Sequence, residues 1–173
     1  MLTHELLTSL LEYDPETGQL FWRERPLTMF KSSGAHTAWN RRYAGQETFT
    51  STHREGYLRG NLLGEPWLAH RTVWWLITAE WPWVVDHING NKADNRIANL
   101  RNGPPKLNAR NRPLHKKNTS GVSGVWYNAR TSKWQTTISG DFLGNFDTLE
   151  EAAVARKAAE TQYGFHENHG RPS

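Results

Sequence analysis

The segment Val84–Arg112 constrains the fold more than any other part of the chain, because it predicts several short elements in close succession. Val84–Ile88 is an apolar run typical of a strand, and the Asn-Gly-Asn that follows is typical of a turn. Ile97–Arg101 predicts the returning strand, and Pro104-Pro105 suits the first turn of a helix. We therefore expect a strand, a loop, a second strand and a helix in this segment.

The chain before this segment predicts a leader of short elements. Thr3 can cap a helix that carries several leucines on one face. Strands are predicted at Gln19–Trp22, Glu47–Thr50, Gly56–Leu63 and Pro66–Ala69, a polar loop at residues 26–42, and a buried helix at residues 70–81 that Pro82 stops.

After the central segment, the pattern predicts a small separate module. Val122–Tyr127, Lys133–Ser139 and Phe142–Phe146 are β-prone runs, and Thr148 opens a capping box followed by an Ala-rich helix. The predicted fold class is therefore α+β. It comprises an N-terminal helix and β-hairpin leader at 1–64, a core at 65–113, a basic linker at 114–120, the module at 121–165 and a mobile tail at 166–173.

The chain contains no cysteine, which excludes disulfides and cysteine-ligated zinc. Small units must then be stabilised by apolar burial, and the nine Trp residues supply large area for it. No apolar stretch has the length of a membrane span, and the N-terminus lacks the basic start and cleavage site of a signal peptide. We expect a cytoplasmic protein, in a bacterial host cell if a phage encodes it.

Basic residues gather after the central strand, in a chain of net charge +4. Such a run has no acidic partners within it, so we expect it to lack ion pairs and to bind nucleic acid, because each neutralised phosphate releases counterions. A solvated basic face is the plain alternative. Between Asp94 and Asp141 the chain has no acidic residue and nine cations: Arg96, Arg101, Lys106, Arg110, Arg112, Lys116, Lys117, Arg130 and Lys133.

Four polar residues of the central segment have the chemistry for phosphodiester hydrolysis. Asp86 and His87 end the first strand, Asn99 follows His87 by twelve positions, and Asn108 follows by nine more. Imidazole is a suitable general base, and carboxylate and amide oxygens suit magnesium or manganese. Asn99 can orient the His87 ring through a hydrogen bond. A single carboxylate binds a dication weakly, so we expect metal affinity to depend on bound DNA phosphates.

Neighbours on a regular strand face opposite sides, so Asp86 and His87 can face one phosphate only if the chain leaves the strand near this pair. A calcium loop starting at Asp86 is excluded, because its third position would be Ile88. Zinc is disfavoured, because His70 and His87 lack ligand spacing. His70 is expected to be an interior histidine outside the site.

Residues 69–112 resemble the HNH nuclease family, in the branch found in bacteriophage homing endonucleases. The resemblance implies a ββα-metal core with His87 as general base, Asn99 as the residue that orients it, and Asp86 with Asn108 as ligands of one Mg²⁺ or Mn²⁺ per active site. Arg101, Arg110 and Arg112 are candidate DNA contacts of this core. The motifs that carry the resemblance are Asp86-His87-Ile88-Asn89-Gly90, Asp94-Asn95-Arg96, Asn99-Leu100-Arg101 and Asn108-Ala109-Arg110-Asn111-Arg112.

Residues 118–165 resemble the AP2 DNA-binding module, through NTSGVSGVWY, SKWQTTI and FLGNFDTLEEAAVARKAA. In that family a three-stranded sheet enters the DNA major groove. Gln135 and Thr137 depart from the family pattern, in which charged side chains are common at these positions. Trp126 and Trp134 have sheet packing as an equal alternative role. The candidate DNA contacts are Trp126, Arg130, Lys133 and Trp134, with Lys116 and Lys117 in the linker as phosphate contacts.

These features predict a metal-dependent endonuclease that nicks one strand of double-stranded DNA at a preferred site, as homing enzymes do. We expect a monomer or weak dimer with no obligatory protein partner and no membrane contact. Two alternatives stay open. One is a non-catalytic, sequence-specific DNA-binding regulator that retains the nuclease scaffold. The other is a protein that binds or cleaves RNA.

Overall fold

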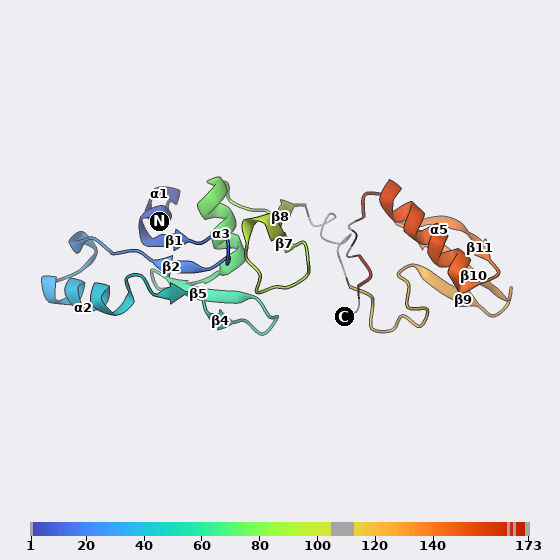
Figure 1. Ribbon diagram of the computed structural model, residues 1–173, viewed down its shortest axis with the longest axis horizontal. Coiled ribbons are helices and arrows are strands. Elements are labelled where there is room, and N and C mark those ends of the chain that lie inside the picture. The colour runs from blue at the N-terminus through green and yellow to red at the C-terminus, as the bar shows by residue number, and fades with distance from the viewer. Residues whose placement is uncertain (1, 105–112, 166, 168, 172–173) are drawn as a thin grey trace. The chain divides into compact units, whose positions relative to one another are not determined.

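The chain divides between Gly103 and Pro104 into two units, Met1–Gly103 and Pro104–Ser173 (Figure 1). The structure is a computed structural model and describes residues 2–104, 113–165, 167 and 169–171. Sheets among the described strands are antiparallel and have two or three strands each. This mixture of short helices and small sheets agrees with the predicted α+β class. Within the described ranges, no helix is long and apolar enough to cross a membrane.

Short elements make up the first unit, with strands in the orders β1-β2-β3, β4-β5-β6 and β7-β8. In chain order they are α1 (His4–Leu10), β1 (Leu11–Tyr13), β2 (Leu20–Trp22), the 3-10 turn η1 (Leu27–Met29), α2 (Ser33–Tyr43), β3 (Glu47–Thr48), β4 (Ser51–Thr52), β5 (Leu58–Leu62), β6 (Glu65–Leu68), α3 (Ala69–Thr78), β7 (Val84–His87), the 3-10 turn η2 (Ile97–Asn99) and β8 (Leu100–Gly103).

One apolar core joins the predicted leader to the predicted nuclease core. Leader and central residues are buried in the same cluster, so the regions 1–64 and 65–103 fold as one unit. Burial of such a leucine contributes about 2 kcal/mol. The members from the leader are Leu7, Leu10, Leu11, Leu20, Phe49 and Leu62, and those from the central segment are Ala69, Val73, Leu76, Val85 and Leu100.

Helices α1 and α3 begin where the sequence predicts, within one residue, but α3 ends early. Thr3 caps α1, and its hydroxyl accepts a hydrogen bond from the amide of Leu6 at 3.2 Å. Helix α3 stops at Thr78 rather than at Pro82, because Ala79 takes a left-handed conformation with φ 59°. The prediction that Pro82 ends this helix is therefore wrong. Residues 97–99 likewise form the turn η2 rather than the start of the returning strand.

Residues 26–42, predicted as a polar loop, contain η1 and most of α2, so that prediction is wrong. The Ser32 hydroxyl caps α2 by accepting from the amide of Ala35 at 3.2 Å. The helix contains no buried residue, and its inner face rests on aromatic rings rather than on aliphatic side chains. A helix held in this way lacks the leucine periodicity from which a buried helix is predicted.

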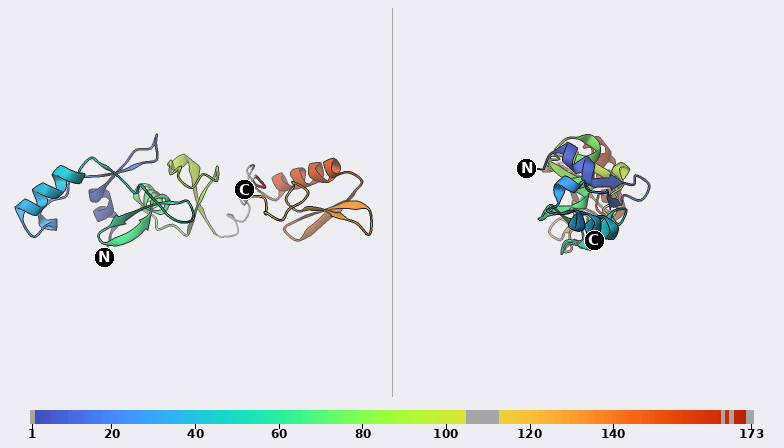
Figure 2. Two further views of the ribbon diagram at one scale, coloured as in Figure 1. Left: turned by 90° about the horizontal axis from the view of Figure 1, so that it is seen from below. Right: turned by 90° about the vertical axis from the view of Figure 1, so that its left-hand side faces the viewer.

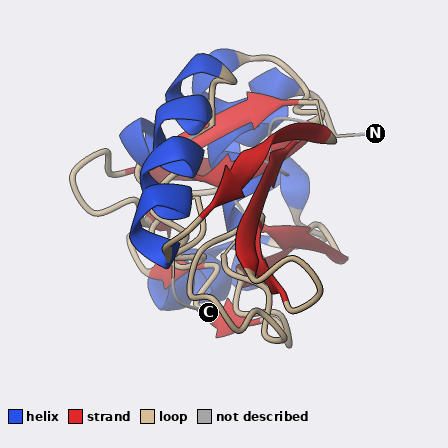
Figure 3. Ribbon diagram, turned by 90° about the vertical axis from the view of Figure 1, so that its right-hand side faces the viewer, coloured by secondary structure: helices blue, strands red, loops and turns tan. Residues whose placement is uncertain are grey.

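A three-stranded sheet with one helix against it forms the second unit, as predicted (Figure 3). The strands are β9 (Val125–Asn128), β10 (Lys133–Ile138) and β11 (Asp141–Phe146), in the order β11-β10-β9, followed by α5 (Leu149–Gln162). Thr148 and Glu151 form the predicted capping box at the start of α5. The Thr136 hydroxyl lies 3.5 Å from the Ala152 carbonyl, which places the middle of β10 against this helix.

The described part of the C-terminal tail, which the sequence predicts to be mobile, forms hydrogen bonds with the rest of the second unit. The carbonyl of Arg171 accepts a hydrogen bond from the amide of Leu114 at 2.8 Å. His169 Nε2 lies 3.1 Å from the Ser123 hydroxyl and 3.2 Å from the guanidinium of Arg156. The tail therefore closes the unit by contacting its first and middle segments.

Candidate active site

The central hairpin places Asp86 and His87 side by side on a regular strand. In the pairing of β7 with β8, Asp86 lies opposite Arg101 and His87 opposite Leu100. The Ile88 amide donates a hydrogen bond to the Asn99 carbonyl at 2.8 Å. The Gly90 amide donates one to the His87 carbonyl at 2.9 Å. The strand thus ends at His87 itself. Burial alternates along it, with Asp86 half-buried and His87 buried, as expected for opposite faces.

Asn95 fixes the ring of His87. His87 is 2% exposed and Asn95 1% exposed, and the Nε2 of the ring lies 3.0 Å from the Oδ1 of Asn95. Asn95 Nδ2 donates to the Ala93 carbonyl at 3.3 Å, which assigns Oδ1 as the acceptor. His87 Nε2 therefore carries the hydrogen, and in the neutral ring Nδ1 carries the lone pair.

Two further aromatic side chains pack around His87. The His70 ring stands edge-on to the His87 ring at 5.1 Å between centroids, and the Tyr57 ring lies 4.7 Å from His70 and 5.8 Å from His87. Burial lowers the pKa of His87, and the hydrogen bond that the ring donates to Asn95 opposes that effect. Burial, with smaller contributions from His87 and Arg71, lowers the pKa of His70 to about 3. Both imidazoles are therefore neutral at neutral pH.

The loop after His87 is held by its own polar side chains. The Asp94 carboxylate accepts from Asn89 Nδ2 at 2.8 Å and from Arg96 Nε and Nη2 at 2.8 and 2.7 Å. These bonds lower the pKa of Asp94 to about 2, with the Arg96 hydrogen bond as the main cause. Asn99 Oδ1 accepts from the Asn89 amide at 2.9 Å, and its Nδ2 donates to the Asp94 carbonyl at 2.8 Å.

The amide of Asn99 therefore holds the loop backbone. Among the described residues, the side-chain amide that forms a hydrogen bond with the His87 ring is that of Asn95, and not that of Asn99 as predicted. Asn95 stands in the Asp94-Asn95-Arg96 motif, and its near-complete burial distinguishes it from the other asparagines of the loop. His70 is interior, as predicted, but it packs on the His87 ring rather than outside the site. Tyr57 had no predicted role, because it comes from a β-prone segment of the leader and carries no motif.

Asp86 forms an ion pair with Arg101, whose Nη2 lies 3.1 Å from Asp86 Oδ2. Arg101 was predicted as a DNA contact, and the structure places its guanidinium on the predicted metal ligand. The other expected ligand, Asn108, and the DNA candidates Arg110 and Arg112 lie outside the described residues. In the ranges that are described, no three His, Cys, Asp or Glu side chains gather as a metal site.

The basic run is less free of ion pairs than predicted. Arg96 pairs with Asp94 and Arg101 with Asp86, because the chain folds the run back onto acids that precede it. Lys133 pairs with Asp147, beyond the end of the run. Lys116, Lys117 and Arg130 are exposed.

The four predicted DNA contacts of the second unit do not share one face. Side chains alternate along β10, and Thr136 faces α5, so Trp134 lies on the helix side and Lys133 on the open side. Trp126 pairs with Gln135 and shares the open side, where it is 41% exposed. Trp134 packs against Tyr127 at 5.3 Å between ring centroids. Trp126 and Lys133 thus lie together on the open face of the sheet, Arg130 lies in the turn between β9 and β10, and Trp134 serves in packing.

Comparison with known proteins agrees with this geometry. Residues 68–110 match the family described as HNH endonuclease, so the chain contains an HNH endonuclease domain that includes β7, η2 and β8. Protein 3.8 of Escherichia phage T7 is 32% identical to the chain over 74 residues, which are 42% of this chain and 61% of that protein. The chain is thus similar to that phage protein over part of each. No solved structure matches.

Proposed function

We propose that the chain is a metal-dependent DNA endonuclease in which His87 is the general base. The observation that carries the proposal is the fixed, neutral ring of His87 beside Asp86 inside an HNH endonuclease domain. In a neutral imidazole whose Nε2–H is bonded to Asn95, the proton-accepting atom is Nδ1. Asn95 then stabilises the imidazolium that forms when the proton arrives.

His70 and Tyr57 support the base from one side. They are packed against the His87 ring and exclude water from that face. Because His70 is neutral, it adds no positive charge that would disfavour protonation of His87 during the reaction. The Asp94–Arg96 pair and Asn99 keep the loop in the conformation that brings Asn95 to the ring.

The donor set fits one hard dication. Asp86 offers a half-buried carboxylate and Asn108 an amide, and substrate phosphate oxygens and waters would complete the shell. When bound, Mg²⁺ or Mn²⁺ would stabilise the negative charge that develops on the phosphate and the leaving oxygen. Arg101 Nη2 lies 3.1 Å from Asp86 Oδ2, so a metal held by Asp86 would share this carboxylate with the guanidinium.

DNA positioning is assigned mainly to the second unit. Trp126 and Lys133 on the open face, Arg130 in the turn and the exposed Lys116 and Lys117 form its candidate DNA surface, in the manner of an AP2-like module. One active site acts on one strand, so a monomer would nick duplex DNA and leave 5′-phosphate and 3′-hydroxyl ends. Deletion of residues 114–173 should weaken DNA binding strongly, and unchanged affinity would contradict this assignment.

The test is conversion of supercoiled DNA that carries the protein's own genomic neighbourhood, with Mg²⁺, Mn²⁺ or EDTA. We expect metal-dependent open circles from the wild type and from His53→Ala, which changes a histidine outside the site. His87→Ala should lower the activity by at least a hundredfold, because a general base contributes roughly 10²–10⁴-fold. Equal cleavage by His87→Ala and the wild type would contradict the assigned base.

Two other outcomes would favour the alternatives. Tight duplex binding in EDTA, with no cleavage in any metal, would support a non-catalytic regulator that retains the nuclease scaffold. Preferential binding or cleavage of RNA in competition with duplex DNA would support an RNA-directed function.

A further inference from the structure

Helix α2 projects from the end of the first unit that is remote from β7 and β8 (Figures 1 and 2). It is 11 residues long and none of them is buried. Its inner face, with His36, Trp39 and Asn40, is half-buried, and the remainder is exposed. We call residues 23–46, which connect β2 to β3, the α2 arm.

Hydrogen bonds and aromatic contacts hold the α2 arm in a defined conformation. Asn40 Oδ1 accepts from the Arg25 amide at 2.9 Å, and Asn40 Nδ2 donates to the Arg25 carbonyl at 3.0 Å. The Arg25 guanidinium lies 3.9 Å from the ring centre of Trp39 and 4.8 Å from that of Trp22. Phe30 packs on Trp39 at 6.1 Å between centroids. These contacts fix the helix to the unit without a buried aliphatic core.

The arm is the basic part of an otherwise acidic first unit. It contains five cations, Arg23, Arg25, Lys31, Arg41 and Arg42, and one acid, Glu24, so its formal charge is +4. The remainder of residues 1–103 has six cations and ten acids, a formal charge of −4. Within the described part of the chain, none of the five arm cations forms an ion pair. The positive charge of the first unit is therefore concentrated on one projecting element.

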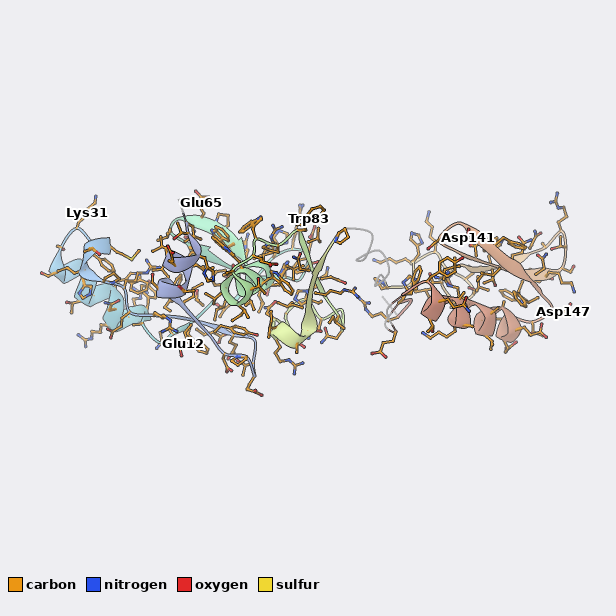
Figure 4. All side chains as sticks on the ribbon, turned by 90° about the horizontal axis from the view of Figure 1, so that it is seen from above. Glu12, Lys31, Glu65, Trp83, Asp141 and Asp147 are labelled. Atoms are coloured by element: carbon orange, nitrogen blue, oxygen red, sulfur yellow. The ribbon has the colours of Figure 1, made fainter. Side chains whose placement is uncertain are left out.

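Three of these cations are available to a ligand. Arg23 Nε donates to the Leu11 carbonyl at 3.0 Å, and Arg25 is stacked between the two tryptophans. Lys31, Arg41 and Arg42 are exposed, and Figure 4 shows the Lys31 side chain pointing away from the rest of the unit. We propose that Lys31, Arg41 and Arg42 of the α2 arm bind the phosphate backbone of the DNA duplex, at a distance from the site of cleavage.

This proposal rests on the proposed function and names a second DNA contact of the same unit. Charge complementarity favours a polyphosphate. The outer face of α2 carries Gly34, Thr37 and Ala38, and the exposed large apolar side chains of the arm are Leu27 and Tyr43, which lie apart from that face in sequence. The arm and the central hairpin lie at opposite ends of the first unit. The expected diameter of a unit of about 100 residues is comparable to the length of one turn of DNA duplex, about 34 Å. Contacts to phosphates position the duplex and do not read its sequence.

The test compares Arg41→Gln/Arg42→Gln with two matched variants, in an otherwise full-length chain. Glutamine is a good helix former, so α2 should persist, which circular dichroism checks. Gln19→Glu/Gln162→Glu lowers the net charge by the same two units at exposed positions outside the arm. Arg41→Lys/Arg42→Lys retains the charge. Affinity for a duplex of about four turns, roughly 40 base pairs, is measured in EDTA over a range of salt concentrations.

Each phosphate contact contributes about 0.9 to the slope of log affinity against log salt, so the Arg41→Gln/Arg42→Gln slope should fall by about two. The lysine variant should keep the wild-type slope, and Gln19→Glu/Gln162→Glu should change it by less than half as much. An unchanged slope, or equal changes in the two charge-matched variants, would overturn the proposal. Because binding is measured without metal, failure of DNA cleavage would reject the proposed activity while leaving this result intact.

Discussion

His70 is a buried titratable side chain, and its ionisation links the stability of the first unit to pH. Its folded pKa of about 3 lies below its ordinary value of 6.5. The unfolded chain therefore binds a proton between these values that the folded chain excludes, and the free energy of unfolding decreases as pH falls below 6.5. Each pH unit in this window costs about 1.4 kcal/mol for one such group.

We predict that lowering the pH from 7.5 to 4.5 destabilises the wild type by about 3 kcal/mol more than it destabilises His70→Gln, since two of these pH units lie below 6.5. Urea unfolding followed by tryptophan fluorescence measures this, because seven of the nine tryptophans lie in the first unit. The same pH dependence in both proteins would show that His70 becomes protonated in the folded state.

Asn95 is expected to act on catalysis through His87. Replacing it by Leu removes the acceptor for Nε2–H, so the ring loses its fixed tautomer, and kcat should fall by roughly 10–100-fold with little change in KM. Asn95→Asp keeps an acceptor and adds a negative charge, which raises the pKa of His87. The acid limb of the kcat–pH profile should then move to higher pH, because the base must be neutral to act. A profile identical to that of the wild type would show that Asn95 has only a structural role.

At the scale of elements, the turn between β1 and β2 packs directly on the loop that carries Asn95. Gly18 has φ 78°, and a Cβ there would lie 2.5 Å from the Arg96 amide nitrogen and 2.7 Å from the Asn95 carbonyl carbon. Gly45 has a similar φ of 73°, but a Cβ would meet nothing within 4 Å. Alanine substitutions at these two glycines therefore distinguish the cost of a left-handed backbone from the cost of steric overlap with the Asn95 loop.

Gly45→Ala should cost about 1–2 kcal/mol from its left-handed backbone alone. Gly18→Ala adds overlap with backbone atoms and should cost about 1–3 kcal/mol more, with loss of DNA cleavage as the Asn95 loop is displaced. Urea unfolding and the open-circle assay measure both effects. Equal destabilisation by the two substitutions would show that the loop shifts freely away from residue 18.

Local signals in the sequence predicted several elements correctly. Thr3 and Thr148 cap their helices, because an N-cap depends only on neighbouring residues. Helix α2 was missed because its inner face is complementary to Trp22 and Arg25, a tertiary relation that periodicity does not show. The spacing of the HNH motifs indicated His87 as the base, but it indicated Asn99 as the residue that orients the ring, whereas Asn95 bonds it. That choice depends on how Asp94 and Arg96 fold the loop.

At the scale of the whole molecule, the two units have separate cores and should unfold separately. The second unit buries Val125, Ile138, Ala152 and Ala159 around its own helix. Thr148→Ala removes the α5 cap and should lower the stability of this unit by about 1 kcal/mol. Amide hydrogen exchange should show faster opening across β9, β10 and α5 and unchanged protection in α1 and α3. Thr131→Ala, in the turn before β10, serves as the control, and a loss of protection in both units would contradict separate unfolding.

The core shared by the leader and the HNH segment has a consequence for inheritance. A recombination crossover just before residue 68 would take Leu7, Leu10 and Leu20 from one parent and Val73, Val85 and Leu100 from the other. The two halves of this core would then come from different sequences and would not pack complementarily. A crossover between the two units would part Asp86 and His87 from Asn108. The leader and nuclease segments are therefore expected to be inherited as one block, and the sequence that follows them to diverge more readily.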